Sequence, residues 1–146
     1  MRISVQPQDF SIDKEVETLV AGRADIGAVV AFSGLVRGDG SIKTMTLEHY
    51  PGMTEKQLHT IAKEAMQRFS LNDCLIIHRV GELKVGERIV LVVTVSKSRK
   101  AAFRGAEFLM DWLKTQAPFW KKESSDDDSR WVEAKAEDTK EQEKWD

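Results

Sequence analysis

One stretch organises the chain: Leu113-Lys114-Thr115-Gln116-Ala117-Pro118-Phe119-Trp120-Lys121-Lys122-Glu123. It follows the most amphipathic helix that the sequence predicts. Proline has no backbone N–H and disfavours the α conformation in the residue before it, so the helix that carries Lys114 should end near Ala117. Lys121 then lies on an extended segment that leaves the helix end. The sequence therefore predicts that two ammonium groups converge on one point from different elements.

The composition is that of one ordinary globular domain. The chain has 146 residues, of which 41% are hydrophobic and 32% are charged, and this length can build a substantial core. A net charge of −2 does not favour a nucleic-acid-binding protein. The segment from Glu123 onward is strongly acidic, so the body before it is net basic, which favours anionic partners.

The sequence also indicates a cytoplasmic protein. Cys74 is the single cysteine, so no disulfide can form within the chain, which is typical of a reducing compartment. The segment Met1-Arg2-Ile3-Ser4-Val5 lacks the apolar region of a signal peptide. Apolar runs in the sequence are all too short for a membrane span, and we expect no contact with a membrane.

Hydrophobic periodicity predicts an α+β domain with three main helices and a mainly antiparallel sheet. Strands are predicted over residues 2–6, 27–37, 43–50, 75–80, 89–95 and 130–134. The run 27–37 is nearly all apolar and predicts a buried central strand, in which Gly34 marks either a bulge or a close backbone approach. Residues 43–50 should form a strand antiparallel to it. Residues 81–87 are predicted to be a turn-rich connector. The domain should cover residues 1–135, with a charged tail over 136–146.

Capping residues and apolar spacing predict where the helices start and which faces they bury. Ser11 and Ser98 are predicted N-caps, and Thr54 with Gln57 is predicted to form a capping box. The predicted core face of the last helix consists of Ala102, Phe103, Ala106, Leu109, Met110 and Leu113.

The sequence does not indicate a metal or nucleotide site. His49, His59 and His78 are scattered, and Cys74 has no second cysteine, so no metal-ligand spacing is present. Walker, dinucleotide-binding and Gly-x-Ser-x-Gly motifs are missing from the sequence, and we expect neither a metal nor a cofactor. Cys74 is interpreted as a small buried hydrophobic residue in preference to a nucleophile.

Basic residues at the ends of elements are the candidate site. Arg37 ends a predicted strand, Arg99 starts a helix, Lys114 ends that helix and Lys121 follows the proline. Each has an ordinary explanation, because a lysine in the last helical turn complements the helix dipole and a terminal arginine is usually solvated. Together they favour an anionic, phosphate-bearing substrate, with one lysine as a general acid or base.

The aromatic pair beside the lysines has two interpretations. Phe119 or Trp120 can anchor the segment in the core, or it can form an aromatic wall for a planar ring. We expect one of the two to be a core anchor and leave the other open.

Five ordered motifs resemble the large, catalytic subunit of molybdopterin synthase, and the resemblance covers about residues 1–135. It implies an α/β-hammerhead fold with an added antiparallel sheet. The motifs are Gly27-Ala28-Val29-Val30-Ala31-Phe32-Ser33-Gly34-Leu35-Val36-Arg37, Leu47-Glu48-His49-Tyr50-Pro51-Gly52-Met53, His78-Arg79-Val80-Gly81-Glu82-Leu83, Pro118-Phe119-Trp120-Lys121-Lys122-Glu123 and Arg130-Trp131-Val132-Glu133-Ala134.

The resemblance also implies an activity and partners. That family transfers sulfur to cyclic pyranopterin monophosphate and so makes the dithiolene of molybdopterin, a step of molybdenum cofactor biosynthesis. The sulfur arrives as a thiocarboxylate on the C-terminal Gly-Gly of a small ubiquitin-like carrier subunit, whose tail enters a pocket of the large subunit. Two large subunits form the central homodimer of a heterotetramer.

Site residues are implied by the same resemblance. Lys114 and Lys121 match the family's essential lysines, and Phe32 and Met110 would line the pocket for the carrier tail. Arg99 would reach the neighbouring subunit's site. The implied substrate-binding residues are Leu35, Val36, Arg37, Ser98, Arg99, Lys114, Lys121, Lys122 and Glu123.

Three features depart from the family pattern. Ser98 stands where the family usually has histidine, Lys135 stands where arginine is expected, and the loop over residues 38–42 is short. Two other hypotheses stay open, and the loss of an imidazole at position 98 bears on the first of them. One is a non-catalytic module that docks a sulfur-carrier tail, and the other is a protein that binds a pterin phosphate without any carrier.

Overall fold

The computed structural model describes residues 1–38, 40–125, 128–132 and 136–145. One layer of the fold is a four-stranded sheet. The strand order is β1 (Arg2–Gln6), β4 (Asp73–Arg79), β6 (Arg88–Ser96) and β2 (Ala28–Leu35). β1 runs parallel to β4, and the other neighbours are antiparallel. The β-branched run of β6 lies at the centre and is buried from Val90 to Ser96, as its composition predicts.

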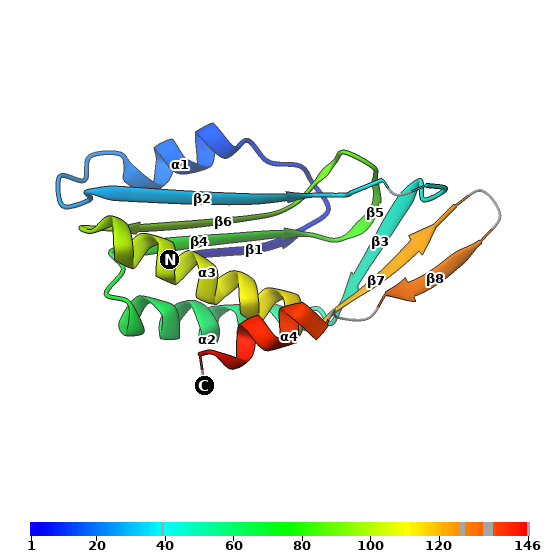
Figure 1. The fold of residues 1–146 in the computed structure, drawn as a ribbon. Coiled ribbons are helices and arrows are strands. Elements are labelled where there is room, and N and C mark those ends of the chain that lie inside the picture. The colour runs from blue at the N-terminus through cyan, green and yellow to red at the C-terminus, as the bar shows by residue number, and fades with distance from the viewer. Residues whose placement is uncertain (39, 126–127, 133–135, 146) are drawn as a thin grey trace.

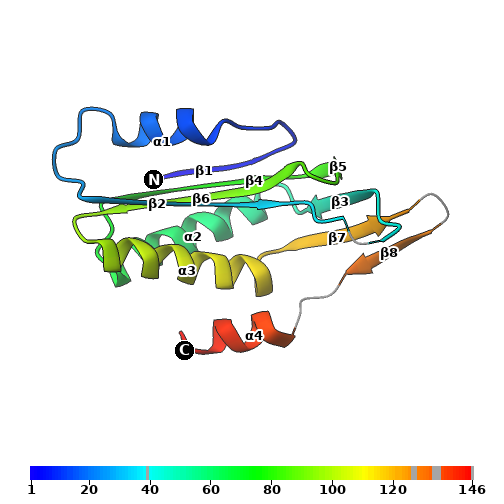
Figure 2. The ribbon, with the colours of Figure 1, turned by 45° about the horizontal axis from the view of Figure 1, so that its top comes forward.

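Helices cover both faces of this sheet (Figures 1 and 2). α1 (Ile12–Val20) packs on one face, where alternate residues of β4 and β6 form a core with its apolar stripe. α2 (Met53–Arg68) and α3 (Arg99–Thr115) pack on the other face. Side chains of successive strand residues point to opposite faces, so each central strand contributes to both cores. Ser11 and Ser98 cap α1 and α3, as predicted.

A second four-stranded sheet extends from one end of the first (Figure 1). Its order is β5 (Gly81–Lys84), β3 (Thr44–His49), β7 (Phe119–Ser124) and β8 (Ser129–Val132), and all its pairs are antiparallel. Val36, Leu47 and Leu83 are buried together beneath it. The α+β class with mainly antiparallel sheet structure is confirmed.

The C-terminal segment contains helix α4 (Ala136–Glu143), which packs beside α3. Trp145 follows it and is 6% exposed, against the rings of Phe69 and Phe108. The sequence predicts only a charged tail here, because one tryptophan among so many charges carries no periodic signal. Residues 133–135, which include the end of the last predicted strand and Lys135, lie outside the described residues.

Two predictions about strand pairing are wrong. β2 is an edge strand, because it pairs with β6 alone, and Val29, Phe32 and Leu35 are exposed on it. β3 does not pair with β2 but belongs to the second sheet. A continuous apolar run indicates that a strand is buried, but it does not tell whether residues of the same chain or of another chain bury it. Of the two alternatives for Gly34, the bulge is confirmed by a register shift between Gly34 and Leu35.

Three local predictions also need correction. Residues 81–84 of the predicted connector form β5, because they find a partner strand in β3. Gly52, not Thr54, is the N-cap of α2, and its N–H donates to Glu55 at 2.6 Å. Phe103 is 58% exposed, whereas Phe108 is buried, so the buried face of α3 lies further round the helix than predicted.

Candidate functional site

Lys114 and Lys121 line one small cavity, as the sequence predicts. The cavity has a volume of about 60 Å³ and lies where the two sheets meet the end of α3. Strands β2, β4, β6 and β7 and helix α3 contribute its walls. The lining residues are Phe32, Gly34, Leu35, His78, Ile89, Val90, Met110, Leu113, Lys114 and Lys121.

The turn at Pro118 brings the two lysines to this cavity. α3 ends at Thr115, and the N–H of Gln116 and Ala117 both donate to the carbonyl oxygen of Trp112. The N–H of Phe119 then donates to the carbonyl oxygen of Ala117 at 2.8 Å, which closes a tight turn around the proline. β7 starts at once, and its pairing with β3 holds Lys121 opposite Leu47.

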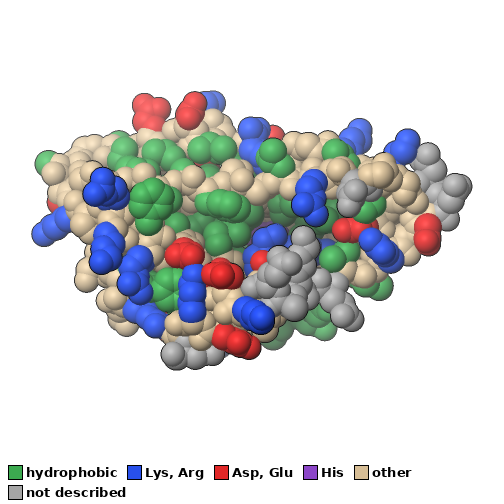
Figure 3. All heavy atoms as spheres, viewed as in Figure 1, with side chains coloured by type: hydrophobic (Ala, Val, Ile, Leu, Met, Phe, Trp, Pro, Cys, Tyr) green, Lys and Arg blue, Asp and Glu red, His purple; other side chains and the backbone are tan. Residues whose placement is uncertain are grey.

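The apolar wall of the cavity comes from residues implied in binding the carrier tail. Phe32 of β2 and Met110 of α3 both line it, and Leu35 lies beside Phe32 at the strand end. Phe32 is 41% exposed and Leu35 is 57% exposed, so this wall opens to the surface. Figure 3 shows hydrophobic side chains gathered along β2 and the neighbouring α3 on the same face of the molecule.

His78 is a residue of this cavity that sequence reasoning missed. It lies near the end of β4, is 5% exposed, and its ring stacks on Phe119 with centroids 3.8 Å apart at 15°. Burial, with Lys121 and Lys114 nearby, lowers the pKa of the imidazole to about 3. The ring is therefore neutral at physiological pH. Its position inside a motif was visible in the sequence, but nothing there indicates what it faces.

Phe119 and Trp120 differ in burial and in the residues that they contact. Phe119 is half-buried and packs between the rings of His78 and His49, so it is the core anchor. Trp120, on the opposite side of the strand, is 39% exposed and meets Tyr50 edge-to-face with centroids 4.4 Å apart. The Trp120 side chain thus forms part of an aromatic surface outside the cavity.

Arg37 and Val36 do not belong to the cavity wall in this chain. Val36 is 2% exposed and packs with Leu47 and Leu83 under the second sheet. Arg37 follows it with an exposed side chain. The arginine leaves β2 at the same strand end as Leu35, so it lies near the cavity mouth along the chain but outside its lining.

Ser98 and Arg99 lie at the opposite end of α3 from Lys114. Fifteen helical steps separate Arg99 from Lys114, which is about 22 Å along the axis. The Ser98 hydroxyl accepts from the N–H of Ala101 at 3.2 Å and so caps the helix. Ser98 lines a different, open hollow with the basic residues Arg68, Lys100 and Arg104. One chain alone therefore does not bring Arg99 to the lysines.

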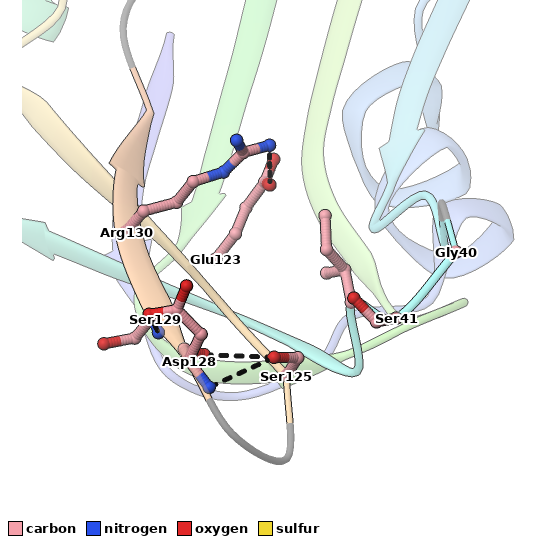
Figure 4. Close-up of a pocket in the computed structure, with 8 residues that line it drawn as sticks. Gly40, Ser41, Glu123, Ser125, Asp128, Ser129 and Arg130 are labelled. Carbon is pink, nitrogen blue, oxygen red and sulfur yellow. Dashed lines mark hydrogen bonds and ion pairs between the residues drawn. The ribbon is translucent and has the colours of Figure 1, made fainter.

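Lys122 and Glu123 contact residues of β8. The Lys122 ammonium lies 5.9 Å from the ring centre of Trp131 on β8, and Glu123 pairs with Arg130 at 3.4 Å. Figure 4 shows the latter pair in a hollow of about 420 Å³ at the tip of the second sheet. That hollow is larger than the lysine cavity but is lined mainly by short polar side chains, and Lys114 and Lys121 are not part of its lining.

An acidic group beside α4 resembles a cation site but is filled by a lysine. Glu107, Asp111 and Glu141 bring their carboxylates within reach of one ion. The Lys144 ammonium lies 2.6, 3.7 and 2.7 Å from them, respectively. The structure thus places an internal cation there, and the group serves to fasten α4 to α3.

Cys74 lies away from the cavity and is fully buried. Burial raises the pKa of its thiol to about 12, so a reactive thiolate is disfavoured. The interpretation of Cys74 as a buried hydrophobic residue is confirmed. Within the described residues, the helices all fall short of the length and apolar character that a bilayer span requires.

Comparison with known proteins gives consistent matches over the whole chain. The family model described as MoaE protein matches residues 5–116. A molybdopterin synthase catalytic subunit from Mesorhizobium japonicum is 51% identical, and the alignment covers 98% of this chain and 92% of the relative.

Two solved structures share the fold. Molybdopterin cofactor biosynthesis protein E from Burkholderia multivorans matches with a TM-score of 0.85 at 46% identity, over 99% of this chain and 95% of that one. Molybdopterin synthase from Staphylococcus aureus matches with a TM-score of 0.81 at 30% identity, over 88% of this chain and 95% of that one.

Proposed function

The chain belongs to the MoaE protein family, and from that premise we propose that it is the sulfur-transferring subunit of a molybdopterin synthase. Its relatives are named catalytic subunits of this enzyme of molybdenum cofactor synthesis. In the proposed reaction a small ubiquitin-like carrier brings sulfur as a C-terminal thiocarboxylate. The acceptor is cyclic pyranopterin monophosphate, and the product carries the dithiolene of molybdopterin.

The convergence of Lys114 and Lys121 on one cavity is the observation that carries this proposal. The acceptor bears a phosphate, and negative charge develops on its oxygen as sulfur attacks. Fixed ammonium groups in a partly enclosed, largely apolar site stabilise such charge strongly, because little water competes for them. Lys121 supplies this charge, and Lys114 acts as the acid that protonates the departing oxygen.

The nucleophile in this scheme comes from outside the chain. Cys74 is buried with a raised thiol pKa and does not line the cavity, so it is a poor sulfur donor. The carrier's thiocarboxylate fills that role. Its Gly-Gly tail has no bulky side chains, which suits a small cavity, and Phe32 and Met110 supply an apolar wall for it.

A homodimer completes the proposed assembly. The exposed edge of β2, with Val29, Phe32 and Leu35, offers an unpaired strand and apolar side chains for a second copy. Arg99 then serves the partner's site, where its guanidinium and the α3 N-terminus hold the substrate phosphate. Arg37, at the strand end, binds substrate from the same chain. The expected location is the cytoplasm, in keeping with a lone reduced cysteine.

A reconstituted assay tests the proposal. The protein is mixed with thiocarboxylated carrier and cyclic pyranopterin monophosphate, and dithiolene formation is followed with loss of the thiocarboxylate. Turnover supports the sulfurtransferase. Carrier binding without product favours instead a docking module, the alternative motivated by Ser98, which serves as a helix cap where the family usually has histidine. Pterin binding that needs no carrier favours a phosphate-binding protein.

A further inference from the structure

Among the described residues that line the lysine cavity, His78 is the only one besides the two lysines with a titratable side chain. It is 5% exposed and sits at the end of β4, a central strand of the first sheet. Its ring is held flat against Phe119, the residue that follows the Pro118 turn. A rigid imidazole is therefore part of the cavity wall that also includes Lys121, which lies two residues after Phe119 on β7.

The hydrogen bonding of the ring fixes its tautomer. Nδ1 of His78 lies 2.9 Å from the carbonyl oxygen of Arg79. A carbonyl oxygen can only accept, so Nδ1 must carry the hydrogen. In the neutral ring Nε2 is then left as a lone-pair acceptor. The stack on Phe119 prevents the ring from turning without losing this bond.

The surroundings of the ring keep it neutral. Lys121, Lys114 and His49 are the titratable groups that oppose its protonation, and burial opposes it more strongly than any of them. A neutral imidazole can accept a hydrogen bond from an ammonium group. Because it stays uncharged, it does not add a third positive charge to the two lysines of the cavity.

We propose that His78 is a positioning residue of this site: when the Lys121 side chain turns into the cavity, its ammonium donates a hydrogen bond to Nε2 of His78, which holds the lysine in that direction. The inference rests on the proposed function, because it assigns His78 a part in the same reaction. The imidazole acts as a fixed acceptor and not as a proton donor to substrate. Lys121 thereby keeps its charge and its direction while Lys114 stays available for proton transfer.

Two substitutions separate this role from simple packing. His78→Phe keeps a ring of similar size against Phe119 but removes the acceptor. His78→Gln loses the stack but returns an oxygen near the place of Nε2. We expect dithiolene formation by His78→Phe to fall about 10- to 100-fold, the loss of one charge-assisted hydrogen bond, and His78→Gln to recover most of it.

A matched control comes from the other side of the same phenylalanine. His49 also contacts Phe119, with centroids 6.4 Å apart, but does not line the cavity and lies 3.6 Å from Glu55 instead. His49→Gln should leave the rate unchanged. Equal losses in His78→Phe and His78→Gln, or unchanged rates in both, overturn the proposal.

A spectroscopic measurement on the unmodified protein tests the tautomer of His78 independently of turnover. Nitrogen-15 NMR of the labelled protein near neutral pH should show His78 with a protonated Nδ1 and a bare Nε2. A protonated Nε2 or a charged ring overturns the His78 role even if the enzyme is active. Failure of the wild-type protein to make dithiolene overturns the proposed function, and the role with it, whatever the tautomer.

Discussion

Lys114 and Lys121 face one cavity although a helix end, a proline turn and a strand start separate them. If Lys114 protonates the departing oxygen, Lys114→Ala removes the acid and should lower dithiolene formation at least about 100-fold. The side chain lies in the last turn of α3, where alanine is a good helix former, so the fold should persist. Single-turnover product analysis and thermal unfolding measure the two effects.

A lysine on another helix provides the control for that change. Lys63 is exposed on α2, and Lys63→Ala removes the same charge without touching the cavity. Its rate and its carrier affinity should equal those of the wild type. Normal turnover by Lys114→Ala would remove Lys114 from the mechanism.

Arg99 provides a test of the dimer. It lies about 22 Å along α3 from Lys114 in its own chain, so a shared site needs Arg99 from a second copy. Arg99→Ala and Lys114→Ala should each be nearly inactive. When the two variants are unfolded together and refolded as mixed dimers, one of the two sites regains both residues. Activity should therefore return in the mixture and not in either variant alone, whereas an inactive mixture would place Arg99 outside the shared site.

Cys74 should be dispensable for sulfur transfer. Because burial raises the pKa of the thiol from 9.0 to about 12, its contribution to folding is complete below pH 9 and is lost as the pH rises toward 12. In the folded protein at pH 8 a thiol reagent should react with Cys74 far more slowly than in urea. Cys74→Ala should still form dithiolene at the wild-type rate. A rapid reaction of the native thiol, together with lost activity in the variant, would argue for a sulfur-relay role.

Much of this architecture is encoded locally and was predictable from sequence. Ser11 and Ser98 identify the starts of two helices because a cap is a contact within one turn. Pro118 identifies the end of α3 in the same way, and it predicts the convergence of the lysines. Such features need no knowledge of which segments meet in space.

The remaining features depend on long-range pairing, which periodicity does not report. β2 has the composition of a buried strand but is an edge strand, since burial of its outer side requires another chain. His78 faces the cavity only because β4 ends beside the start of β7. Trp145 joins the core through contacts with α2 and α3 residues far away in the sequence. The positions of His78 and Trp145 therefore cannot be predicted from the periodicity of the neighbouring sequence.

The buried imidazole of His78 should make stability depend on pH. In the unfolded chain it binds a proton below its ordinary pKa of 6.5, but in the folded protein only near pH 3. The unfolded state therefore holds the extra proton between these values, and stability falls as the pH drops below 6.5, by about 1.4 kcal/mol per pH unit. Urea unfolding from pH 7 to 4.5 measures this slope. His78→Gln should flatten it, and an equal slope in the variant would assign the effect to other groups.

Trp145 should hold α4 on the body of the protein. Its ring meets Phe69 and Phe108 edge-to-face, and its Nε1 donates to Asp111 at 2.6 Å. Trp145→Ala empties this site and should lower the free energy of unfolding by about 3 kcal/mol. Trp145→Phe keeps most of the packing but loses the bond to Asp111, so the free energy of unfolding should fall by about 1 kcal/mol.

Trp131, 55% exposed, gives the matched control, because Trp131→Ala should change stability by less than about 0.5 kcal/mol. Similar values for Trp145→Ala and Trp131→Ala in urea unfolding would mean that α4 does not stabilise the domain.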